Sequence, residues 1–183
     1  MSWGTYARLV SRLDVLVAWF GRQIAWLVLA LVALVAANVL GRYLFSAGTV
    51  ALQELEWHLM AVLALVGISY GINRGEEVRV DMLYAHYGRR TKALVDALSA
   101  VLMTAVAALL FWLSLSYVGQ SYTLGEGSPD PGGLPDRYLL KAMMPVGFAL
   151  LAAQGLVDLA KAVLRFDLAK AAHQQTVDAP NGK

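Results

Sequence analysis

The sequence contains no cysteine and only three histidines, His58, His86 and His173. The first absence excludes disulfides, thiolate metal sites and a cysteine nucleophile. A membrane haem with two axial histidines needs a pair of histidines within membrane-spanning helices. Only His58 lies near a long apolar stretch of this sequence. The sequence also lacks zinc-ligand spacing, a Walker loop, a nucleophile elbow and a dinucleotide fingerprint. We therefore expect neither an enzyme nor a bound cofactor or metal.

Charge is scarce as well, since 15% of the 183 residues are charged and 58% are hydrophobic. A soluble domain carries about 25% charged residues. The charges separate four uncharged runs, at residues 24–41, 59–72, 97–125 and 142–157. A helix rises about 1.5 Å per residue and the hydrocarbon core is about 30 Å thick, so each run, with its flanking residues, can cross the membrane as a helix.

These runs predict an all-α integral membrane protein with four transmembrane helices in a single membrane domain, residues 23–165. The expected spans cover about residues 23–43, 55–73, 97–121 and 138–160. Four spans place the N-terminal segment, the second loop and the tail on one side, and these hold twelve of the fifteen lysines and arginines. The positive-inside rule then predicts that both termini lie in the cytoplasm. The net charge of +2 gives no indication of nucleic-acid binding.

The segments outside the spans have their own patterns. Apolar residues recur at helical spacing in residues 1–22, with Arg8 and Arg12 between them, which predicts an amphipathic helix in the membrane interface. A cytoplasmic extension of the first span is the alternative. The tail, residues 166–183, is expected to be partly disordered. The basic residues that precede the third span are expected to face anionic lipids.

The third loop, residues 126–137, reads EGSPDPGGLPDR and holds three of the five prolines. Proline and glycine at this density preclude a helix and favour turns. We expect a compact, structured cap on the extracytoplasmic side.

Two carboxylates, Glu54 and Glu56, lie where the second span enters from outside. They could bind a cation or a partner, or favour the helix N-terminal dipole while hydrated. Residues two apart on a helix point in different directions, so a shared metal site is not expected. Gly67 and Gly71 form a GxxxG pattern, which allows a close helix approach.

The spans hold no charge at their centres. We interpret Asn38, Ser69, Ser99, Thr104, Ser114 and Ser116 as their polar content. Serine and threonine in a membrane helix mostly bond to the preceding turn. Transporters usually bury ionisable groups near the midplane. We therefore expect that this chain does not carry a hydrophilic solute alone.

The order of motifs resembles the small membrane subunit, the DctQ-like subunit, of tripartite ATP-independent periplasmic (TRAP) transporters. The resemblance covers about residues 39–163. It rests on NVLGRYLF, ELEWHLM, GISYGINRGEEVRVDML and GLPDRYLLKAMMPVGFALL, in this order.

The resemblance implies a subunit of a sodium-coupled transporter for organic acids in the bacterial inner membrane. Its partners would be a large permease subunit, which it scaffolds, and a periplasmic substrate-binding protein, which it helps to dock. Neither a cofactor nor catalysis is implied. The positions that match the family motifs are candidates for a partner interface, and so is the GxxxG pair. The candidate partner-interface residues are Glu54, Glu56, Gly67, Gly71, Arg74, Arg79, Asp81, Gly133, Leu134, Pro135 and Pro145. A self-contained channel or exporter working as a homo-oligomer, and a membrane electron-transfer subunit, are the alternatives.

Overall fold

The computed structural model describes residues 3–46, 48–76 and 84–178, and long helices account for most of them. The helices are α1 (Trp3–Phe45), α2 (Val50–Arg74), α4 (Arg89–Thr123) and α5 (Tyr138–Asp178). Each contains a segment long and apolar enough to cross a membrane. In the described part of the chain these segments are Val10–Phe45, Val50–Arg74, Arg90–Thr123 and Tyr138–Phe166. The prediction of an all-α protein with four membrane-spanning helices is confirmed.

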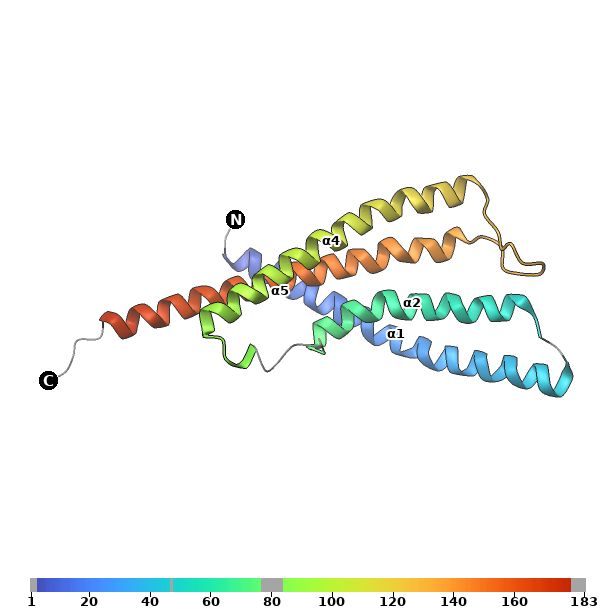
Figure 1. Ribbon diagram of the computed structural model, residues 1–183, viewed down its shortest axis with the longest axis horizontal. Helices are drawn as coiled ribbons and strands as arrows, with labels where there is room; N and C mark the ends of the chain where they lie inside the picture. The colour runs from blue at the N-terminus through green and yellow to red at the C-terminus, as the bar shows by residue number, and fades with distance from the viewer. Residues whose placement is uncertain (1–2, 47, 77–83, 179–183) are drawn as a thin grey trace.

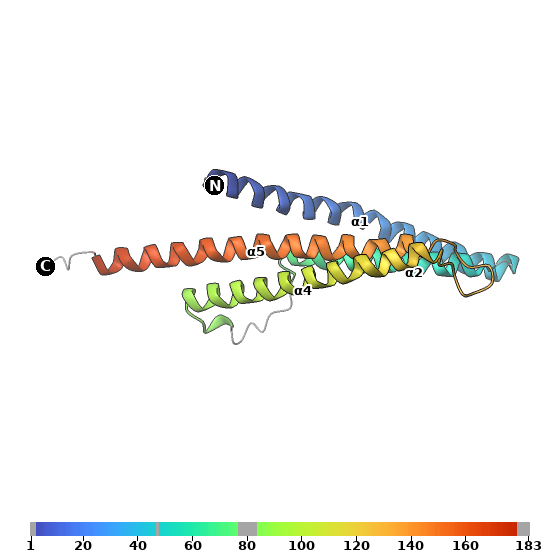
Figure 2. The ribbon, with the colours of Figure 1, turned by 90° about the horizontal axis from the view of Figure 1, so that it is seen from above.

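The four helices form two antiparallel hairpins, α1–α2 and α4–α5, which lie side by side (Figure 1). The two connections at residues 46–49 and 124–137 lie at one end of the molecule, which we call the hairpin end. The first turns of α1 and α4 and the last turns of α2 and α5 lie towards the other, the terminal end (Figures 1 and 2). The described parts of the N-terminal segment, the second loop and the tail therefore lie towards the same end of the molecule.

Helix α5 is the centre of the bundle, because it packs against α4, α2 and α1. An apolar cluster of Val17, Ile24, Val66 and Leu150 joins α1, α2 and α5. Glycine allows two of these close approaches. A Cβ atom at Gly147 would lie 2.8 Å from the Cβ of Leu65 in α2, and one at Gly155 would collide with Thr104 in α4.

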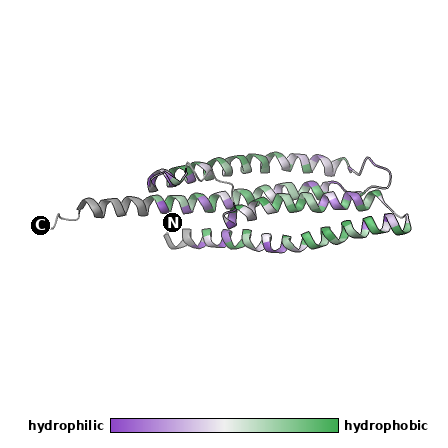
Figure 3. Cartoon of the chain, turned by 60° about the horizontal axis from the view of Figure 1, so that its bottom comes forward, coloured by the Kyte–Doolittle hydropathy of each residue, from purple (hydrophilic) through white to green (hydrophobic). Residues whose placement is uncertain are grey.

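The outward surface of the bundle is broadly apolar. Trp26 in α1 is 70% exposed and Trp112 in α4 is 71% exposed. Figure 3 shows that apolar residues occupy most of the middle of the helices. A surface of this kind is suited to acyl chains or to the helices of another membrane subunit.

Residues 1–22 differ from the prediction of a separate interfacial helix. Helix α1 continues from Trp3 through Arg22 to Phe45 without a break, which is the alternative that the sequence left open. Gly21 does not end the helix, because it lies within α1 and packs against Tyr70 of α2, and α1 contains no proline. The membrane position of this segment stays a prediction. At the other terminus α5 remains helical to Asp178, further than the sequence indicated.

The ends of α2 follow from its sequence. Thr49 adopts an extended conformation before the helix, and its hydroxyl accepts a hydrogen bond from the Leu52 N–H at 3.4 Å. Gly75 ends the helix at a φ of 76°, a left-handed conformation that glycine adopts readily. This pair of caps fixes where Glu54 lies relative to the hairpin end.

Candidate functional site

Glu54 lies in the second turn of α2 at the hairpin end, and its side chain faces the α4–α5 connection. Glu54 is only 9% exposed. One carboxylate oxygen accepts a hydrogen bond from the Ser128 hydroxyl. The other accepts one from the Leu134 N–H at 2.6 Å. Glu54 therefore attaches the third loop to α2, rather than standing hydrated at the helix N-terminus.

The third loop is closed on itself around this contact. The Ser128 N–H donates to the Leu134 carbonyl at 3.1 Å, and the Gly133 N–H donates to the Asp130 carbonyl at 3.0 Å. A Cβ at Gly133 would lie 2.7 Å from a Glu54 carboxylate oxygen and would also collide with Ser128. Only glycine lets the loop approach this closely, and the structured cap that the sequence predicted is present.

A second attachment holds the base of the loop. The Glu126 carboxylate pairs with the Lys141 ammonium and accepts a hydrogen bond from the Ser121 hydroxyl at 2.7 Å. The Lys141 ammonium also lies 4.1 Å from the ring centroid of Tyr117. The hydrogen bond from Lys141, followed by the one from Ser121, holds the pKa of Glu126 below its ordinary value. The loop is thus anchored on α4 and α5 as well as on α2.

Glu56 faces a different neighbour. It accepts a hydrogen bond from the Asn38 side-chain amide at 2.8 Å, which links α2 to α1. The two carboxylates therefore point to different neighbours, Glu54 to the third loop and Glu56 to α1, as their spacing predicted. Asn38 is 6% exposed, and its side-chain oxygen is buried without a hydrogen-bond partner among the described residues.

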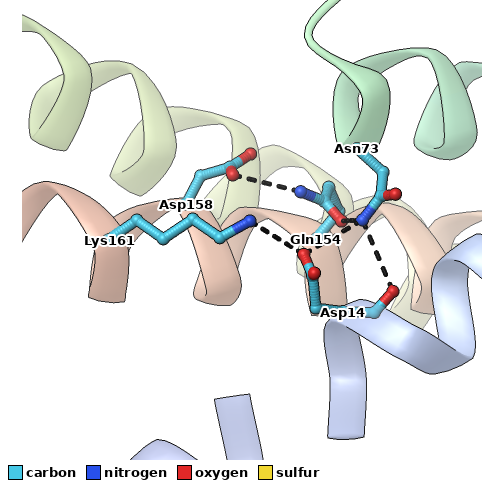
Figure 4. A network of polar contacts seen from close by, with 5 residues as sticks. All are labelled: Asp14, Asn73, Gln154, Asp158 and Lys161. Atoms are coloured by element: carbon cyan, nitrogen blue, oxygen red, sulfur yellow. Dashed lines mark hydrogen bonds and ion pairs between the residues drawn. The ribbon is translucent and has the colours of Figure 1, made fainter. Parts of the chain in front are cut away.

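A polar network joins three helices towards the terminal end (Figure 4). The Asn73 amide of α2 donates to Asp14 of α1 at 3.1 Å and to Gln154 of α5 at 3.0 Å. The Gln154 amide donates to Asp158 at 3.1 Å, and the Lys161 ammonium pairs with Asp14 at 2.8 Å. Gln154 is fully buried. The network fixes the relative position of α1, α2 and α5, and its members satisfy one another.

The described residues include no group of three or more histidine, aspartate or glutamate side chains that could hold a metal ion. The polar side chains described above are engaged in holding helices and the third loop together. This arrangement supports a structural role within a membrane assembly.

The comparison with known families decides the class of protein. The family model described as "Tripartite ATP-independent periplasmic transporters, DctQ component" matches residues 31–165. The chain belongs to this family. It is also similar to a protein of Halomonas elongata described as "Ectoine TRAP transporter small permease protein TeaB". The two are 27% identical over 154 residues, which cover 82% of this chain and 74% of that protein.

The DctQ family membership makes the chain a small permease subunit of a TRAP transporter, and the resemblance inferred from the motifs is confirmed. Such a subunit is a component of a transporter. The matched segment begins within α1 and ends within α5, so it includes all of α2 and α4 and part of the two outer helices.

The predicted glycine pair of this DctQ subunit makes no close contact with another helix in the described part of the chain. Among the described residues, no atom outside the local helix backbone lies within 4 Å of a Cβ built at Gly67 or at Gly71. The close helix approaches are at Gly21, Gly147 and Gly155 instead. A partner interface at Gly67 and Gly71 stays a prediction.

The remaining candidates that the structure describes are Arg74, Pro135 and Pro145. The Arg74 guanidinium donates to the Tyr70 hydroxyl at 3.1 Å at the end of α2. Pro135 is exposed in the third loop, while Pro145 is buried within α5. Arg79 and Asp81 lie outside the described residues.

The polar network was missed as a site. Its five members, Asp14, Asn73, Gln154, Asp158 and Lys161, were not among the candidate residues, and Gln154 was left out of the polar content of the spans. A signal was present, because Gln154, Asp158 and Lys161 follow a spacing of four and three and so share one helix face.

Proposed function

We propose that this small permease subunit braces the large permease subunit of a sodium-coupled TRAP transporter for organic acids, in the bacterial inner membrane. It takes no catalytic part. It also helps to dock the periplasmic substrate-binding protein. The family membership supports the part of this proposal that makes the chain a small TRAP subunit.

The observation that carries the proposal is the use of polar groups in the bundle. Glu54, Glu56 and Gln154 are each hydrogen-bonded to another helix or to the third loop. Over the same helices the outward surface is apolar, with Trp26 and Trp112 mostly exposed. A bundle in which these polar side chains bond to its own helices and loop is suited to scaffolding, and its apolar surface can pack against a larger membrane protein.

The proposed orientation places the hairpin end in the periplasm. The third loop would then lie on the side where a soluble binding protein arrives. The distribution of basic residues supports this orientation, since the N-terminal segment, the second loop and the tail hold twelve of the fifteen lysines and arginines.

The substrate class proposed is organic acids. The relative from Halomonas elongata is described as an ectoine transporter subunit, so ectoine belongs in a substrate panel beside dicarboxylates, 2-oxo acids and sialic acids.

Co-purification tests the bracing role. We expect the untagged chain to elute with an affinity-tagged large subunit, at a constant ratio, from membranes solubilised in a mild detergent. The large subunit expressed without this chain should be recovered in lower yield. Elution of the chain by itself as a homo-oligomer, with the large subunit free of it, would instead favour the channel alternative.

A further inference from the structure

The Glu54 side chain attaches the third loop to the α1–α2 hairpin. Glu54 is buried, and both of its carboxylate oxygens are used, one by the Ser128 hydroxyl and one by the Leu134 N–H at 2.6 Å. Hydrogen bonds to a carboxylate are about twice as strong as neutral ones. Since Leu134 lies 80 residues from Glu54 in sequence, this contact joins the two hairpins at the hairpin end.

The conformation of the third loop directs two hydrogen-bond donors at the Glu54 carboxylate. Its own hydrogen bonds, from Ser128 to Leu134 and from Gly133 to Asp130, close a short loop that presents the Leu134 N–H and the Ser128 hydroxyl to Glu54. The absence of a Cβ at Gly133 leaves the room that the carboxylate needs. The conformation of the loop therefore depends on Glu54 from one side and on Gly133 from the other.

The exposed residues of the loop include two carboxylates. Asp130 and Asp136 are exposed, as are the three prolines of the loop. The prolines restrict the backbone, so a loop held at both ends loses little further entropy when a partner binds. A soluble partner with a basic surface would match these carboxylates electrostatically.

We propose that Glu54 is a positioning residue that holds residues 126–137 as a preformed docking surface for the periplasmic substrate-binding protein. The inference rests on the proposed function, and it assigns to Glu54 an effect on the loop rather than contact with substrate. Gly133 serves the same contact from the loop side.

The test compares Glu54→Ala and Gly133→Ala with Gln53→Ala, a matched control at an exposed neighbouring position of α2. The complete transporter is purified and reconstituted in vesicles. Amide hydrogen exchange is followed in the peptide that contains Leu134. Uptake is measured at saturating substrate while the concentration of binding protein is varied.

We expect faster amide exchange at Leu134 in Glu54→Ala and in Gly133→Ala than in the wild type. Exchange in Gln53→Ala should match the wild type. The concentration of binding protein that gives half-maximal uptake should rise about tenfold, because a loosened loop must be ordered on docking, while the maximal rate changes little. Normal exchange in Glu54→Ala would overturn the proposal. Faster exchange with an unchanged half-maximal concentration would overturn it too, as would loss of the large subunit from the complex. Failure of the wild-type complex to form or to take up substrate would point to the proposed function itself.

Discussion

Gln154 accepts a hydrogen bond from Asn73 and donates one to Asp158 from a fully buried position in α5. An unpaired amide in an apolar interior is costly, so the pairing explains how a glutamine is accommodated in the fourth span. Asp14 and Lys161 complete the network from α1 and from the next turns of α5. Residues of this kind set which faces of the helices meet.

A double-mutant cycle tests the Asn73–Gln154 pair. With Asn73→Ala, Gln154→Ala and the double variant, we expect a coupling free energy of unfolding of about 0.6 kcal/mol and at most about 1.7 kcal/mol, which are the average and the maximum for hydrogen bonds between membrane helices. Reversible unfolding in mixed micelles gives the values. The pair Asn73→Ala and Gln120→Ala is the control, because Gln120 is exposed near the hairpin end, and its effects should add. Additivity for Asn73 and Gln154 would contradict the network.

Glu126 gives the loop a pH dependence. Hydrogen bonds from Lys141 and then from Ser121 lower its pKa from an ordinary value of 4.5. Because the pKa of Glu126 is lower in the folded state than its ordinary value of 4.5, the ionised carboxylate stabilises the folded state above pH 4.5. This stabilisation is lost as the pH falls below the ordinary value and through the folded-state pKa. The thermal stability lost in Glu126→Gln should therefore be largest near neutral pH and shrink as the pH falls below about 4.5.

Thermal unfolding of the purified chain at several pH values measures this difference. Gln53→Ala, an exposed neutral position at the same end, should show the same small difference from the wild type at every pH. A gap between Glu126→Gln and the wild type that stayed constant down to the acid limit would mean that the ion pair contributes nothing.

At the scale of elements, hydropathy predicted the helices and left their contacts undetermined. The uncharged runs gave the four spans, because a bilayer admits few other structures. They did not show which glycine faces a neighbour, since this depends on how each helix is rotated. Gly147 packs on Leu65, whereas the GxxxG pair Gly67 and Gly71 faces open space within the chain. The same limit applies to Glu54, whose partners lie in a loop far along the sequence.

Two glycine substitutions separate these cases. Gly147→Ala places a Cβ 2.8 Å from the Cβ of Leu65 and 3.2 Å from its carbonyl oxygen, so it should destabilise the chain. Overpacking of this kind costs about 1–3 kcal/mol. Gly67→Ala meets no atom within 4 Å and should leave stability unchanged or slightly higher. Unfolding of the isolated chain measures both.

The same two variants test the predicted partner interface when the complex is purified. If Gly67 lies against the large subunit, Gly67→Ala should lower the yield of the complex without lowering the stability of the isolated chain. A complex recovered in full would remove Gly67 from the interface.

At the scale of the whole molecule, both hairpin connections lie at one end, and the first turns of α1 and the last turns of α5 lie towards the other. The number of spans and this arrangement were predictable from the sequence, because the charged residues separate four uncharged runs and the lysines and arginines are concentrated in alternate connecting segments. The extent of α1 was not, because an amphipathic pattern of the kind in residues 1–22 is compatible with an interfacial helix and with a cytoplasmic extension of a span.

The orientation can be measured by cysteine labelling, because the natural chain has no cysteine. Ser46→Cys lies at the hairpin end and Glu76→Cys at the end of α2. With an impermeant maleimide, we expect labelling of Ser46→Cys in intact spheroplasts and labelling of Glu76→Cys only after permeabilisation. The unaltered chain is the blank, and the opposite pattern would place the third loop in the cytoplasm.

Reconstituted uptake tests the central claim, that this chain is a bracing subunit and moves no solute by itself. Vesicles are prepared with the chain alone, with the large subunit and binding protein alone, and with all three components. Sodium-driven accumulation of an organic acid should appear with all three, fall strongly when this chain is omitted, and be absent with the chain alone. Accumulation of the acid in vesicles that contain only this chain would contradict the account.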